Sequence, residues 1–139
     1  MLFLKILHLN ARWVSRMRSI GSRVKLIFER EVLGGAEPDF LIVGAQKSGT
    51  TSLFEYLSER SGFIGSTPKE VHFFDREDHF VKGNRWYEKH FLRRGLASGL
   101  RFEASPEYLC REKVPERIRS YNGGIKIIII LREPVSRAY

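Results

Sequence analysis

Apolar residues follow two different spacings along the chain. Residues 40–43 and 125–131 are almost unbroken apolar runs, which are typical of strands buried on both faces of a parallel sheet. Between these runs, residues 50–59 place Leu53, Phe54 and Leu57 on one face of a predicted helix. Because strands alternate with helices, the pattern predicts an α/β fold in which helices flank a parallel sheet.

Cap and turn residues mark further elements after the first helix. Ser105 before Pro106 is a helix-start signal, and a proline also fits the first turn of a helix at position 115. The additional predicted elements are a strand or buried turn at 71–74, and helices at 86–91, from 105–106, from 115 to 122–124, and from 133–134.

The N-terminal 36 residues differ from the rest in charge and pattern. They hold seven Lys or Arg against two Glu, and their apolar residues recur at helical spacing. Such a basic amphipathic helix either packs on the body with a solvated face or lies on an anionic membrane through residues 1–30. The glycines at 34–35 and Pro38 interrupt the helix, so the chain is expected to divide into residues 1–36 and 37–139.

No membrane span or signal peptide is predicted. The apolar opening at residues 1–9 contains Lys5 and His8 and is shorter than the roughly 20 residues of a spanning helix. It also lacks a preceding basic segment and a small-residue cleavage site. We therefore expect a cytoplasmic location, with membrane association through residues 1–30 left open.

Composition and charge exclude several classes of protein. The chain has 139 residues, 42% of them hydrophobic, which fits one domain and excludes intrinsic disorder. The formal net charge is +8, but residues 37–139 hold only three more basic than acidic residues, so no nucleic-acid partner is expected. Cys110 is the only cysteine, which excludes an internal disulfide framework and a cysteine-based metal centre. We expect Cys110 to be buried or half-buried.

Residues 44–52, GAQKSGTTS, carry the strongest chemical signal. They lie between a predicted buried strand and a predicted helix, where backbone N–H groups and the helix dipole favour an anion. Lys47 adds a full positive charge, and hydroxyl groups add short donors. In a nucleoside-triphosphate loop the lysine directly follows the second glycine, but here Thr50 follows Gly49. The usual magnesium-binding arrangement is therefore absent, and no metal is predicted.

This loop resembles the 5′-phosphosulfate loop of sulfotransferases, which bind 3′-phosphoadenylyl sulfate without a metal. The resemblance implies that Lys47 lies near the oxygen between phosphate and sulfate, where it would offset charge on the leaving nucleotide. The residues expected to bind this co-substrate are Lys47, Ser48, Gly49, Thr50, Thr51, Ser52 and Arg132.

Three further segments resemble the heparan-type carbohydrate sulfotransferases and their bacterial relatives, in the same order. They are KEVHFFD at 69–75, EASPEYL at 103–109, which matches the segment after the middle strand, and IIIILREPVSRAY at 127–139. The resemblance covers residues 38–139 and implies a P-loop-like three-layer fold that is incomplete at its C-terminus. A serine that accompanies Arg132 in the family would fall at position 140.

The resemblance also assigns roles in the reaction. Glu70 is the expected general base for an acceptor hydroxyl or amine, since an ordinary glutamate is ionised at neutral pH. The alternative is a surface ion pair between Lys69 and Glu70. His72 is expected in the active-site cleft as a third catalytic residue beside Lys47, or else as a hydrogen-bonded core histidine. Asp75 is expected to anchor the loop. Arg132 would pair with the 3′-phosphate, unless it is simply a charged strand end.

The sequence predicts a sulfotransferase acting on an acceptor that is a glycan or another hydroxyl compound. Two other readings stay open: a nucleotide kinase with a degenerate loop, and a truncated fragment that binds nucleotide, membrane or polyanion without turnover. A basic cluster around the predicted helix at 86–91 either holds an acidic glycan, with Trp86 stacked on a sugar, or forms a solvated face. The cluster consists of Lys82, Arg85, Lys89, Arg93 and Arg94.

Overall fold

The computed structural model describes residues 35–92 and 97–133. The predictions for the N-terminal basic helix, for Arg93 and Arg94 and for the helix after Glu133 lie outside these residues. Within them, no helix has the length and apolar character that crossing a membrane would require. The cytoplasmic location stays a prediction.

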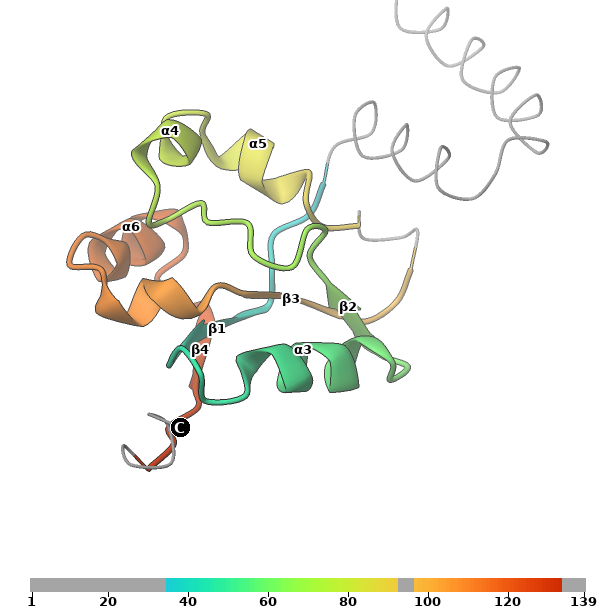
Figure 1. The fold of residues 1–139 in the computed structure, drawn as a ribbon. Coiled ribbons are helices and arrows are strands. Elements are labelled where there is room, and N and C mark those ends of the chain that lie inside the picture. The colour runs from blue at the N-terminus through green and yellow to red at the C-terminus, as the bar shows by residue number, and fades with distance from the viewer. Residues whose placement is uncertain (1–34, 93–96, 134–139) are drawn as a thin grey trace, which may run out of the picture.

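Four strands form one parallel sheet (Figure 1). They are β1 (Phe40–Gly44), β2 (Phe63–Gly65), β3 (Leu100–Ala104) and β4 (Lys126–Ile129). Their order is β2-β3-β1-β4, so β1 has a parallel neighbour on each side. The predicted parallel sheet flanked by helices is confirmed.

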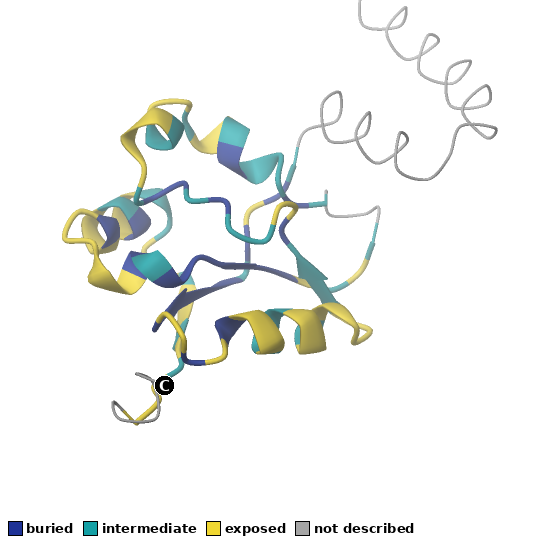
Figure 2. Cartoon of the chain, in the orientation of Figure 1, coloured by how far each residue is buried: buried dark blue, intermediate teal, exposed yellow. Residues whose placement is uncertain are grey.

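The apolar run of β1 supplies both faces of the sheet. Phe40 and Ile42 belong to one core cluster, and Leu41 and Val43 to another, as the twofold period of a strand requires. Helix α3 (Thr50–Ser58) packs its predicted apolar face on the Phe40 side, and Figure 2 shows its outer face exposed. Cover on both sides favours an unbroken apolar sequence, which explains the pattern at residues 40–43.

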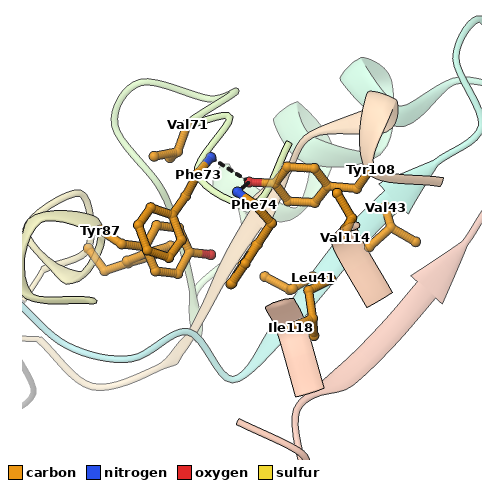
Figure 3. Packing of buried hydrophobic residues seen from close by; sticks show 10 residues of the cluster. Leu41, Val43, Val71, Phe73, Phe74, Tyr87, Tyr108, Val114 and Ile118 are labelled. Atoms are coloured by element: carbon orange, nitrogen blue, oxygen red, sulfur yellow. Dashed lines mark hydrogen bonds between the residues drawn. The ribbon is translucent and has the colours of Figure 1, made fainter. Parts of the chain in front are cut away.

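The opposite face is covered by short helices and a buried turn. The elements are α4 (Glu77–Phe80), α5 (Asn84–Glu88), the 3₁₀ helix η2 (Pro106–Cys110) and α6 (Val114–Tyr121). Residues 71–74 form a turn whose Phe73 and Phe74 rings are fully buried among these helices (Figure 3). The Phe73 ring stacks on Tyr87 at a centroid distance of 4.5 Å. Of the two predicted forms of residues 71–74, the buried turn is therefore correct.

The apolar pattern did not indicate two of the strands, although the resemblance implied a strand before residue 103, and one prediction about a strand is wrong. β2 is short, and β3 carries Arg101 and Glu103 in an otherwise apolar run, although both side chains are buried. β4 forms within the predicted run, but Ile127 and Ile129 are exposed, so it is not buried on both faces by the described residues. Arg101 and Glu103 interrupt the apolar pattern of β3, so the pattern does not indicate this strand. β4 is exposed because it lies at the edge of the sheet that the described residues form.

The segment after β3 differs from the prediction in detail. The helix predicted at Ser105-Pro106 forms as η2, but the Ser105 hydroxyl does not cap it and donates to Glu103 instead, at 2.6 Å. Cys110, at the end of η2, is exposed, so the expected burial of its thiol is wrong. A short 3₁₀ helix on the surface turns only part of its residues to the core, and Pro106 and Tyr108 occupy that part.

Candidate active site

The loop between β1 and α3 presents unsatisfied donors at the carboxyl end of the sheet. Within the described structure, the N–H groups of residues 49–52 donate to no other backbone carbonyl. The Ser48 hydroxyl is buried and has no hydrogen-bond partner among the described residues. Free amides at a helix N-terminus and an orphaned buried hydroxyl are what a phosphate or sulfate group satisfies. The residues present therefore fit the phosphosulfate part of the expected co-substrate.

Backbone conformation sets the direction of this loop. Gly49 has φ 95° and Lys47 has φ 58°, and a Cβ added to Gly49 would meet no atom within 4 Å. Lys47 is exposed, as are Thr51 and Ser52, whereas Thr50 is buried. The left-handed turn lets β1 pass directly into α3 with the lysine in the turn itself, rather than inside the helix.

A second cluster follows in the segment of residues 70–75. The Glu70 carboxylate lies 2.8 Å from the Lys69 ammonium through Oε1 and 3.2 Å from His72 Nε2 through Oε2. His72 Nδ1 lies 2.8 Å from Asp75 Oδ2, and the Asp75 side chain is only 3% exposed. The expected Lys69–Glu70 surface pair is thus present, but Glu70 also contacts His72, and Asp75 fixes the imidazole ring.

The contacts of His72 with Glu70 and Asp75 determine which hydrogen bonds its imidazole ring can make. A neutral imidazole donates from one nitrogen only, whereas the protonated ring donates to Asp75 and Glu70 together. His72 has φ 54°, and with Lys47 it is one of two non-glycine residues with positive φ in the described part of the chain. Such conformations cost about 1–3 kcal/mol each and gather at functional sites. The two strained positions coincide with two of the three residues that the sequence predicted as catalytic.

Backbone hydrogen bonds connect the loop with the two other parts of the predicted site. The Ser105 N–H donates to the Ile42 carbonyl in β1 at 3.2 Å, while its hydroxyl accepts from the His72 N–H at 3.4 Å. On the other side of β1, the Ala45 N–H and the Gly44 carbonyl both bond to Ile130, each at 2.8 Å. Arg132, which is exposed, follows two residues later. These bonds hold the loop, His72 and the strand that leads to Arg132 at the carboxyl end of the sheet, where parallel sheets bind ligands.

A buried hydrogen-bond network around Glu103 of β3 was not predicted from the sequence. Glu103 is fully buried and accepts hydrogen bonds from Ser105, Tyr87 and Tyr108. Burial raises the pKa of the Glu103 carboxyl, and these hydrogen bonds oppose the rise. The segment 103–109 was expected to follow a strand, but its first two residues lie in β3 itself. A glutamate inside an apolar strand was the available signal.

Trp86 packs inward beside the site. The centroids of the Trp86 and Phe73 rings are 6.2 Å apart, and the Lys82 ammonium lies 4.6 Å from the Trp86 ring centroid. The solvated-face reading of the basic cluster is consistent with this packing, because the indole is engaged with the core and with Lys82.

Comparisons with known proteins identify the family of this chain. Heparan sulfate glucosamine 3-O-sulfotransferase 5 of Mus musculus is 39% identical over 101 residues, which cover 73% of this chain and 29% of that protein. Bifunctional heparan sulfate N-deacetylase/N-sulfotransferase 4 of Mus musculus is 37% identical over 123 residues, covering 84% of this chain and 14% of that protein. No protein-family model matches the chain.

A solved structure shares the fold. The crystal structure of a sulfotransferase from Alicyclobacillus acidocaldarius superposes with a TM-score of 0.60 at 34% identity, covering 74% of this chain and 47% of that chain. The chain therefore spans less than half the length of these similar proteins. Sequence identity and the shared fold together show that the chain belongs to the sulfotransferases, of whose domain it spans a part.

Proposed function

We propose that this chain carries the donor loop and the acceptor base of an enzyme that moves a sulfuryl group from 3′-phosphoadenylyl sulfate to a carbohydrate hydroxyl or amine. The observation that carries the proposal is the set of free amides at residues 49–52. They follow β1, which Ser105 joins to the segment holding Glu70 and His72. The names of the similar proteins, which refer to heparan sulfate and its glucosamine, support a glycan acceptor.

The donor side follows from charge and hydrogen-bond direction. The amides at residues 49–52 and the hydroxyls of Ser48, Thr50, Thr51 and Ser52 would donate to the phosphosulfate oxygens. Arg132 would pair with the 3′-phosphate through its planar guanidinium. Lys47 would stabilise the negative charge that develops on the nucleotide phosphate as its bond to sulfur breaks.

The acceptor side follows from the Glu70 carboxylate. As the acceptor oxygen or nitrogen forms its new bond to sulfur, its proton passes to Glu70, and the electron pair of the broken S–O bond leaves on the nucleotide phosphate. His72, held between Glu70 and Asp75, would keep the carboxylate in place and share the proton that Glu70 accepts. The proposal requires no metal.

The test uses the full-length protein that contains this chain, with turnover and nucleotide affinity measured separately. Glu70→Gln keeps the shape of the side chain but cannot accept a proton, so turnover should fall by about 10²–10⁴-fold. The dissociation constant for adenosine 3′,5′-bisphosphate should hardly change. Glu116→Gln, on the exposed surface of α6, is the matched control and should leave turnover unchanged. Normal turnover in Glu70→Gln would remove Glu70 from the mechanism.

A second variant tests the donor loop. Lys47→Ala should reduce turnover by more than tenfold, because a charge on the leaving group loses its partner. Lys126→Ala, at the opposite end of β4 from the loop, is the control. Activity within about threefold of the parent, which is under 1 kcal/mol in barrier height, would exclude Lys47 from the mechanism.

A binding measurement distinguishes the sulfotransferase from the nucleotide kinase. Calorimetry would measure the binding of ATP and of adenosine 3′,5′-bisphosphate with magnesium and with a chelator. Magnesium-dependent binding of ATP, without binding of the bisphosphate, would favour a kinase.

A further inference from the structure

Side chains from β3, from η2 and from Ser105 between them hold the backbone of residues 71–74 in place of a neighbouring strand. In chain order, the four N–H groups donate to Glu103 Oε1, to Ser105 Oγ and, for the last two, to the Tyr108 hydroxyl. The distances are 3.2, 3.4, 2.9 and 3.4 Å, and Figure 3 shows the two bonds to Tyr108. Four consecutive amides thus depend on three side chains that lie about 30 residues further along the chain.

Glu103 decides which way the two hydroxyl groups point. Its Oε1 accepts the Ser105 proton at 2.6 Å and the Tyr108 proton at 2.8 Å, while Oε2 accepts the Tyr87 proton at 2.5 Å. A hydroxyl has a single proton, so a hydroxyl that donates to Glu103 can only accept from the amides. The carboxylate therefore turns the lone pairs of Ser105 and Tyr108 toward residues 72–74.

We propose that Glu103 is a positioning residue for the acceptor base, acting through its bond to Val71 and through Ser105 and Tyr108. The inference deepens the proposed function and rests on it. The held segment begins directly after Glu70 and includes His72, whose φ of 54° persists only where the surroundings impose it. When these bonds are lost, His72 is free to leave the strained conformation, and the Glu70 carboxylate that it contacts moves with it.

The network has the burial that such a role needs. Glu103 and Ser105 are 0% exposed, and Tyr108 is 2% exposed. A buried carboxylate is tolerated when its donors are all in place, so the network has one satisfied arrangement and is rigid. Burial also raises the pKa of the Tyr108 hydroxyl, which keeps its proton on the oxygen and available to Glu103.

The primary test is Tyr108→Phe in the full-length protein. The ring stays and the hydroxyl is lost, so two buried amides lose their acceptor. Since displacement of a reacting group by about 1 Å can cost 10²-fold, turnover should fall by about 10- to 100-fold at saturating substrate. The dissociation constant for adenosine 3′,5′-bisphosphate should stay within about twofold, because the donor loop is intact.

Tyr121→Phe is the matched control. Tyr121 packs its ring against Phe73 and Phe74, but its buried hydroxyl makes no hydrogen bond with the described residues. This variant removes a hydroxyl from the same core without touching the amides of residues 71–74, and it should keep turnover within twofold of the parent. Equal losses in Tyr108→Phe and Tyr121→Phe would reduce the effect to general core packing and overturn the proposal.

A double-mutant cycle with Glu70→Gln separates positioning from stability. If Tyr108 acts through Glu70, Tyr108→Phe should lower turnover little further once Glu70 is Gln. Full additivity of the two losses, or normal turnover in Tyr108→Phe, would overturn the positioning role while leaving Glu70 as the base. Normal turnover in Glu70→Gln alone would instead overturn the proposed function itself.

Glu103→Gln gives a second, independent variant should Tyr108→Phe not fold. Its amide places a donor where one carboxylate oxygen accepted, so at least one hydroxyl must turn its proton away. Turnover should again fall at least tenfold with unchanged nucleotide affinity, and the loss should again disappear in the Glu70→Gln background. A lowered melting temperature with normal turnover below it would show a purely structural role and overturn the proposal.

Discussion

Gly44, the last residue of β1, offers a sharp test of the packing beneath the donor loop. Its φ is +150°, which an L side chain rarely adopts. A Cβ there would lie 2.8 Å from Leu109 Cβ and 3.0 Å from the Pro106 carbonyl oxygen, both in η2. Gly44→Ala therefore combines backbone strain with a clash between β1 and η2 that no flexible side-chain end can relieve.

The magnitude follows from two separate costs. Backbone strain at positive φ amounts to about 1–2 kcal/mol for a residue with a Cβ. Overpacking of a closely packed site adds about 1–3 kcal/mol. We expect Gly44→Ala to lower the free energy of unfolding by about 2–5 kcal/mol, a large part of the total stability of a domain.

Gly49→Ala isolates the clash. Gly49 also has a positive φ, 95°, but a Cβ there meets no atom within 4 Å, so this variant carries the strain alone. The gain from a stiffer unfolded chain is the same for both glycines and cancels. Urea denaturation of the nucleotide-free, full-length protein should show Gly44→Ala less stable than Gly49→Ala by about 1–3 kcal/mol. Equal stabilities would refute the close approach of η2 to β1.

Two further predictions concern pH. The Arg117 guanidinium bonds to Glu77 and lowers the pKa of that carboxyl. The pair therefore stabilises the fold fully above the ordinary pKa of 4.5, and this stabilisation is lost as pH falls through the lowered pKa. Glu77→Gln should therefore be less stable than the parent at neutral pH and equally stable in strong acid; a deficit that persists in acid would contradict this. Burial raises the pKa of Glu103, so the native state binds a proton more readily than the unfolded chain, and stability should decline as pH rises from 4.5 through the raised value. Denaturation curves across this range should show the decline in the parent and a flatter dependence in Glu103→Gln, and identical slopes would contradict it.

The site could be predicted from the sequence where its residues are adjacent in the chain. The loop at residues 44–52 contains its glycines, lysine and hydroxyls within nine positions, and the strand and helix around it have clear periodicity. The contacts among Glu70, His72 and Asp75 also lie within six residues. Local spacing brings such groups within reach of one another, because few residues separate them in the chain.

Tertiary structure decided everything that depends on distant partners. The sequence by itself determined β1 and α3 through their apolar periods and α6 through its proline start and glycine stop, because these signals are local. It did not reveal β3, whose buried Glu103 is satisfied by a backbone amide 32 residues away and by a tyrosine 16 residues away. It left open whether residues 71–74 form a strand or a buried turn, and the structure decides for the turn because Glu103, Ser105 and Tyr108 take the place of a strand partner. A charge in the interior is stable only with such partners, and no local pattern records where they lie.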